Sequence, residues 1–182
     1  DVKVVVVGGN AGSPSSVEKL LPTLDSDTPP VVVCCSTLSG FVEAFIAKIK
    51  SRCKVSLKAA NSGDVLHMGE VYLAPAGAHT KIQMSSAGHL TLSIEKGMPV
   101  GSQIPSATVL FQSAVKAVGG NVYGILLGGF GSDGVDGLQT IQAKGGVTVV
   151  ENPDSAGFPY GPQKAIEIGV ADHVLNLVEM NP

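Results

Sequence analysis

The chain has 182 residues, a formal net charge of -3, a hydrophobic content of 44% and only 15% charged residues. This size and composition fit one domain with a sizeable core, so we expect residues 1–182 to form a single domain. Arg52 is the only arginine, so the chain lacks the basic stripe that nucleic-acid binding requires. No apolar run approaches the roughly 18 residues of a membrane span, which predicts no membrane insertion and a cytoplasmic location.

The first predicted element is a strand formed by four consecutive valines, Val4–Val7. Such a run is typical of a strand that is buried on both faces, as in a parallel sheet. The glycine-rich segment 8–12 then allows a sharp turn close to a ligand, with Asn10 at its apex. The following Ser13-Pro14 pair is a typical start of a helix.

Strands and helices are predicted to alternate along most of the remaining chain. After the first helix, which reaches about residue 24, the expected elements are strand 31–35, helix 41–49, helix 105–118, strand 122–127, helix 135–143, strand 147–150, helix 162–168 and a short strand 174–177. This alternation predicts an α/β fold: a doubly wound, mostly parallel sheet with helices on both faces.

Residues 53–104 are less regular and rich in strand signals. We expect strands at 55–57 and 71–73, and an antiparallel hairpin that pairs 80–84 with 90–94. We interpret the whole segment as an insertion within the domain.

Ligands of open α/β sheets bind at the carboxyl ends of the strands, which here are followed by loops 8–14, 34–40, 128–134 and 151–162. A dinucleotide site is one alternative, but its fingerprint would place glycines where this chain has Asn10 and Ser13. The second strand ends in Cys34-Cys35 rather than in an acidic ribose ligand, and no phosphate-binding Gly-Lys-Ser/Thr is present. The sequence therefore predicts no cofactor.

The first turn matches the nucleophile turn of serine hydrolases, G-x-S-x-G, in every position except the nucleophile. The segment 8–12 reads Gly-Gly-Asn-Ala-Gly. The Asn10 amide can orient or hydrogen-bond a substrate, but it cannot form an acyl-enzyme.

Several separated motifs resemble the catalytic domain of the CheB-type chemotaxis receptor methylesterases, from Val4 to about Val178. They are VGGNAGS at 7–13, SGF at 39–41, GEVYLAP at 69–75 with Gly77 and His79, PS at 105–106, GGFGSDG at 128–134, KGG at 144–146, and KAI at 164–166 with Gly169 and Asp172. Their order and spacing together make the resemblance specific.

The resemblance implies hydrolysis of glutamyl methyl esters on chemoreceptors, and deamidation of receptor glutamines, by a Ser-His-Asp triad. Position by position, the family serine falls on Asn10, the family histidine on Ser36 and the family aspartate on Asp133. Backbone groups of Ala11 and Phe130 correspond to the positions that hold the oxyanion. Because loss of a nucleophile or base alone costs about a millionfold in a serine protease, ordinary triad chemistry is expected to be lost.

Two functional hypotheses follow from this resemblance. The first is a non-catalytic homologue that binds a chemoreceptor cytoplasmic segment, a signalling protein or a small ligand through Asn10, Ser36 and the amides of residues 130–134. The alternative is a still-active esterase or amidase with a rearranged set, such as Ser13 or Ser36 with His79 and Asp133. Control by phosphorylation would require a receiver domain outside these residues.

Several residues of the candidate site also have simpler interpretations. Asp133 matches an ordinary helix start, where it would cap backbone amides. Cys34, Cys35 and Cys53 suggest reduced thiols, although Cys34 or Cys35 as a nucleophile stays open. His89 and His173 are expected in solvent, away from the site, whereas the sequence does not place His67. No grouping has metal-ligand spacing, so no metal is predicted.

Overall fold

The structure, a computed structural model, describes all 182 residues. Its main sheet has seven parallel strands in the order β3-β4-β2-β1-β7-β8-β9. The strands are β1 (Val4–Gly9), β2 (Val31–Cys35), β3 (Ser56–Ala59), β4 (Glu70–Leu73), β7 (Val122–Leu126), β8 (Val147–Glu151) and β9 (His173–Leu175). The predicted doubly wound sheet is confirmed.

Strand β1 lies at the centre of the sheet and explains the valine run. Val4 and Val6 belong to one buried cluster, whereas Val5 and Val7 belong to the other. Since side chains alternate across a strand, the four valines fill both faces of the sheet.

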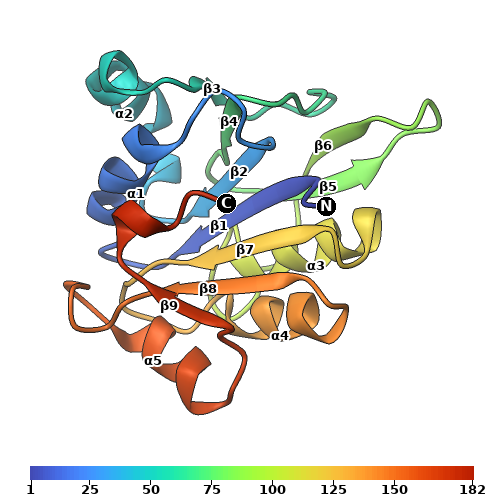
Figure 1. The fold of residues 1–182 in the computed structure, drawn as a ribbon. Coiled ribbons are helices and arrows are strands. Elements are labelled where there is room, and N and C mark those ends of the chain that lie inside the picture. Colours follow the sequence, from blue (N-terminus) through green and yellow to red (C-terminus); the bar gives the residue numbers. More distant parts are fainter.

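Helices cover both faces, as Figure 1 shows. The helices are α1 (Pro14–Leu20), α2 (Val42–Ile49), α3 (Ala107–Val118), α4 (Val135–Ala143) and α5 (Tyr160–Glu167), with short 3-10 turns η1 (Leu21–Thr23), η2 (Ser39–Phe41), η3 (Lys50–Arg52) and η4 (Leu177–Glu179). Buried residues of α1 and α2 pack on one face, together with the half-buried Leu177 of η4. Buried residues of α3, α4 and α5 pack on the other face. None of these helices combines the length and apolarity that a membrane span needs.

An antiparallel hairpin, β5 (His79–Met84) with β6 (Leu90–Glu95), stands outside the main sheet. Its register, with Thr80 opposite Ile94 and Met84 opposite Leu90, agrees with the predicted hairpin. It packs on α3, where the Ser113 hydroxyl accepts the Ile82 N–H at 2.9 Å.

The predicted insertion 53–104 is too long at its start, because β3 and β4 belong to the main sheet. Strand β4 pairs in parallel with β2, and β3 pairs with β4 at the edge. Each of these strands has only four residues, and β3 is half exposed, so neither carries a buried run like that of β1.

The strand order reverses beside β1, and this position defines the candidate site. From β1 the chain proceeds to β2 on one side, and it later returns as β7 on the other side. The carboxyl ends of β1 and β7 therefore form a topological switch point, where α/β proteins bind ligands.

Candidate functional site

Asn10 follows β1 directly and is buried, with 1% of its surface exposed. Its side-chain N–H donates to the backbone oxygen of Asp133 at 3.1 Å, which links the two loops of the switch point. The other side-chain atom, Oδ1, is buried and has no hydrogen-bond partner. A nucleophile or binding group at this position would have to be reached by a substrate, and this side chain is covered.

The loop after β7 provides the cover. A Cβ added to Gly131 would lie 2.9 Å from Asn10 Oδ1, and one added to Gly129 would lie 2.9 Å from the Asn10 carbonyl carbon. Gly131 also has φ +126°, a conformation that favours glycine. These glycines let the loop lie directly on Asn10.

The backbone N–H of Phe130, which was expected to stabilise the oxyanion, already has a hydrogen-bond partner. The Phe130 N–H donates to the carbonyl oxygen of Ala11 at 2.7 Å. A backbone N–H that already has a partner at this distance must break that bond before it can stabilise an oxyanion.

Ser36 and Asp133, the other two triad positions, hydrogen-bond to different partners. The Ser36 hydroxyl donates to Gln103 Oε1 at 2.6 Å. The Asp133 carboxylate accepts the Ser106 hydroxyl and the Ala107 N–H, each at 2.7 Å. The structure therefore brings Asn10 and Asp133 together through a backbone oxygen only, and it does not link Ser36 to either.

Asp133 thus caps a helix, but not the one that its sequence neighbours suggested. Its carboxylate accepts N–H groups at the N-terminus of α3. Helix α4, which follows Asp133 in the chain, has Gly134 as its N-cap residue and no side-chain cap. The partner helix comes from a distant segment, so local sequence could not identify it.

His79 is buried, and both of its ring nitrogens are occupied. Nδ1 accepts the Ser106 N–H at 3.2 Å, so the ring proton is on Nε2, which donates to the Met98 oxygen at 2.8 Å. Ser13, fully buried, donates its hydroxyl to the Gly128 oxygen at 2.5 Å. The hydroxyls of Ser13 and Ser36 and the imidazole of His79 are therefore not hydrogen-bonded to one another.

The two cysteines at the end of β2 are also poorly suited to act as nucleophiles. Burial raises the pKa of the Cys34 thiol well above its usual value, and burial also raises the pKa of Cys35. The thiolate is the reactive form, so both groups are held in the unreactive state near neutral pH. His67, His89 and His173 are exposed and make no side-chain hydrogen bond.

Sequence reasoning missed an exposed aromatic surface at this edge of the sheet, formed by Phe130, Phe158 and Tyr160. The rings of Phe130 and Phe158 are in contact, with centroids 3.9 Å apart and an angle of 33° between their planes. Together with Pro159 and Gln163, the three side chains line a hollow of about 230 Å³. The aromatic residues in the predicted site loops 128–134 and 151–162 were the sequence feature that could have revealed this surface.

A doubly wound parallel sheet, with a turn of the nucleophile-elbow pattern at its switch point, defines a hydrolase-type α/β domain. Comparison with known proteins identifies the particular family. The chain belongs to the CheB methylesterase family, whose model matches residues 5–182.

Relatives and a solved structure agree with this assignment. The chain is 33% identical over 180 residues to a protein-glutamate methylesterase/protein-glutamine glutaminase of Bordetella pertussis, and 35% identical over 166 residues to one of Archaeoglobus fulgidus. These alignments cover 98% and 91% of this chain, but 51% and 47% of the relatives, so the chain spans about half of their length. The Thermotoga maritima CheB methylesterase catalytic domain superposes with a TM-score of 0.93 at 25% identity, covering 99% of this chain and 95% of that one.

Proposed function

We propose that this domain is a non-catalytic member of the methylesterase family that binds a partner in chemotaxis-like signalling. The main support for the loss of catalysis is residue 10. An asparagine amide replaces the family hydroxyl there and lies buried under Gly131. An amide in this place can neither attack an ester nor reach one.

Two further contacts support the loss of catalysis. The histidine position holds Ser36, which cannot take up a proton as a base does, and its hydroxyl is bonded to Gln103. The Phe130 N–H is bonded to Ala11, which removes the preorganised donor that an acyl transfer needs.

The aromatic surface supports a binding role. The most exposed aromatic side chains of the chain are Phe41, Phe130, Phe158 and Tyr160, and all follow carboxyl ends of sheet strands. Aromatic side chains dominate the energy of protein interfaces when they are presented in a rigid arrangement. The rings of Phe130 and Phe158 lie against each other with centroids 3.9 Å apart, which limits the motion of each.

The relatives' name, protein-glutamate methylesterase, points to the partner class. We propose a cytoplasmic chemoreceptor segment as the first partner to test, with a signalling protein as the next. Binding would then use the outer surface of the loops rather than Asn10 and Ser36.

Methanol release from a methylated chemoreceptor tests the catalytic half of the proposal. The domain is expected to release no methanol above buffer, while the Thermotoga maritima catalytic domain serves as the positive control. Turnover that disappears in the His79→Ala variant would overturn the proposal in favour of the rearranged Ser/His/Asp set.

Binding to the unmethylated receptor segment tests the second half. Phe130→Ser is expected to weaken binding by at least about tenfold, because an interface aromatic contributes about 2 kcal/mol or more. Met98→Ser is the matched control, since Met98 is 82% exposed and lies outside the aromatic surface. Equal affinity of both variants would contradict the assignment of this surface.

A further inference from the structure

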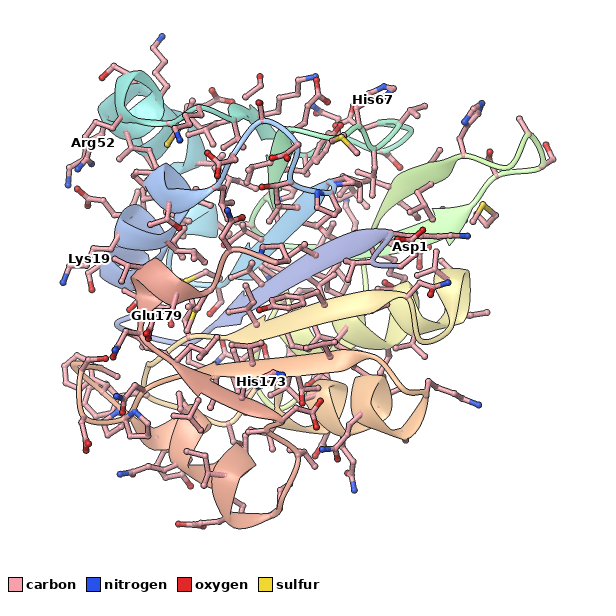
Figure 2. All side chains as sticks on the ribbon, viewed as in Figure 1. Asp1, Lys19, Arg52, His67, His173 and Glu179 are labelled. Atoms are coloured by element: carbon pink, nitrogen blue, oxygen red, sulfur yellow. The ribbon has the colours of Figure 1, made fainter.

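A hollow of about 470 Å³ lies at the amino ends of β1 and β2, the end of the sheet opposite to the candidate site. Its apolar lining comes from segments that are far apart in the chain: Val2, Pro29, Pro30, Val65, Met68 and Leu90. Val65 is 37% exposed and Met68 is 64% exposed, so this apolar surface is open to solvent. Figure 2 shows His67, which also lines the hollow, and the chain start at Asp1 on the side of the molecule where β1 begins.

Backbone hydrogen bonds hold the walls of this hollow in place. The Leu66 N–H donates to the Leu90 oxygen at 2.9 Å, which fixes the loop of residues 65–68 against the β5–β6 hairpin. The Gly69 N–H donates to the Thr28 oxygen, also at 2.9 Å, which fixes the same loop to the segment before β2. The surface therefore keeps its shape without a partner, and a preformed surface loses little conformational entropy on binding.

Three basic side chains surround the apolar lining, and we call this site the basic hollow. They are Lys3 before β1, His67 in the loop between β3 and β4, and His89 at the hairpin turn. None of the three side chains has a hydrogen-bond or ion-pair partner. No acidic residue lines the hollow, although the chain has 15 acidic residues against 12 lysines and arginines.

The charge of Glu70 reaches His67, but the Glu70 carboxylate is bound to other partners. It accepts a hydrogen bond from Lys58 Nζ at 2.6 Å and another from the Tyr72 hydroxyl. These contacts hold it on β4, outside the lining of the basic hollow. The three basic side chains are therefore vacant donors that a partner can reach from solvent.

The lining defines the chemistry of the ligand. An ammonium group has three N–H donors and an imidazole has at least one in either protonation state, so a carboxylate can accept hydrogen bonds from several of them. The apolar side chains, with an adaptable methionine among them, favour a ligand that is apolar next to its carboxylate. We propose that the basic hollow docks a segment of a partner protein in which an aspartate or glutamate is flanked by bulky apolar residues.

The exposure of the lining favours a protein segment over a small molecule. Small-molecule sites enclose about 70–90% of the ligand surface. In the basic hollow His67, Met68 and His89 are all exposed, so a small carboxylate would stay largely in water. A chain segment can lie across the rim and bury its apolar side chains together with its carboxylate. This docking surface is at the opposite end of the sheet from Phe130 and is independent of the binding role proposed above.

NMR titration of the isotope-labelled domain with short capped peptides tests the basic hollow. The peptides carry a central glutamate between two leucines, two phenylalanines or two methionines. Each has two controls, one with glutamine in place of glutamate and one with serines in place of the apolar residues. At least one acidic apolar peptide is expected to shift the amide resonances of His67 and His89, and to bind about threefold or more tightly than both of its controls.

Two variants separate the charged and the apolar parts of the binding. Lys3→Gln is expected to weaken the acidic peptides about two- to fivefold, the range of an exposed ion pair, and to leave the glutamine controls unchanged. Met68→Ser is expected to weaken both kinds of peptide about three- to tenfold. Lys116→Gln and Met98→Ser are the matched controls, because both residues lie outside the basic hollow, and they should leave binding unchanged. All four side chains are at least partly exposed, so the thermal unfolding midpoints should match that of the wild type.

The proposal is overturned if no acidic peptide shifts the amides of the basic hollow, or if the glutamine controls bind as tightly as the acidic peptides. Shifts confined to Phe130 and Phe158 would also overturn it, and they would instead support the aromatic surface. Octanoate is the small-molecule probe, and tighter binding of octanoate than of every peptide would assign the hollow to a small carboxylate. A dimer in sedimentation that Met68→Ser converts to a monomer would show that a second copy of the chain occupies the hollow, again against the proposal.

Discussion

The carboxylate of Asp133 holds the first turn of α3 through Ser106, whose hydroxyl donates to Asp133 Oδ1 at 2.7 Å. The same carboxylate accepts the N–H groups of Ala107 at 2.7 Å and Thr108 at 3.2 Å. An aspartate that the family resemblance places in a catalytic triad therefore satisfies helix amides in this protein. Its charge also interacts favourably with the positive end of the helix dipole.

Asp133→Asn is expected to lower the free energy of unfolding by about 1–2 kcal/mol, because an amide nitrogen replaces one of the accepting oxygens. Urea unfolding at pH 7 measures the change. Asp136→Asn, on the exposed first turn of α4, is the control and should change stability by less than about 0.5 kcal/mol. A catalytic rather than structural role would instead leave the stability intact and abolish an ester hydrolysis.

Asn10→Asp tests whether position 10 is closed to solvent. A carboxylate there would be buried beneath Gly131, so we expect a loss of about 2–4 kcal/mol at pH 7. Burial raises the folded-state pKa of this carboxyl above its unfolded value of about 3.9, so the penalty grows as the pH rises from about 4 and is small at or below it.

Urea unfolding of Asn10→Asp between pH 4 and pH 7.5 measures this dependence. Asn10→Ala, which introduces no ionisable group, should show no comparable change with pH. If Asn10→Asp were as stable as the wild type at pH 7, the position would be solvated and open, as an active-site position is.

The core of the sheet could be predicted from sequence because it depends on local patterns. The valine run of β1 and the turn between β5 and β6 each contain their own signal. Strands β3 and β4 could not be assigned to the main sheet, since four residues carry too little periodicity to distinguish an insertion from an edge pair.

The state of the candidate site depends on contacts between distant segments, which a single sequence does not specify. Asn10 was predicted at the apex of a sharp turn close to a ligand, whereas in the structure it is buried beneath Gly129 and Gly131, which lie far later in the chain. The hydrogen bond from the Phe130 N–H to the Ala11 oxygen also joins segments that are far apart in the chain, and so does the cap of α3 by Asp133. The loops expected to form the site could therefore be named from the sequence, whereas the accessibility of their side chains could not.

Gly12→Ala is expected to disturb the aromatic surface. Gly12 has φ +99°, and an added Cβ would lie 2.4 Å from a ring carbon of Phe158. Gly63→Ala is a matched control, because Gly63 has φ +91° and open space around the added carbon. Each substitution costs about 1 kcal/mol for the left-handed backbone, and the additional loss in Gly12→Ala measures the contact with Phe158.

Thermal unfolding of both glycine variants, together with their affinity for the receptor segment, provides the readout. Gly12→Ala should be the less stable variant and the weaker binder, because Phe158 must move away from its place against Phe130. Identical stability and affinity of the two variants would show that Phe158 does not rest on Gly12 in solution.

Asp172 connects the starts of β8 and β9 and should contribute to stability in a pH-dependent way. Its carboxylate accepts the N–H and hydroxyl of Thr148, at 3.0 and 2.9 Å, and the amide of Gln142 at 2.9 Å. Burial, the largest single influence, acts to raise the pKa of Asp172, but the hydrogen bonds from Gln142 and Thr148 together outweigh it, so the pKa is lowered.

A lowered pKa stabilises the fold above the unfolded value of about 3.9, and this contribution is lost as the pH falls through the folded-state pKa below it. Asp172→Asn should therefore cost a constant amount between about pH 5 and pH 7, and progressively less below about pH 4. Because Asp172 is largely exposed, we expect no more than about 1 kcal/mol. Urea unfolding across this range compares it with Asp154→Asn, whose carboxylate accepts no hydrogen bond. A difference from wild type that does not shrink below pH 4 would show that the ionised carboxylate is not what stabilises this junction.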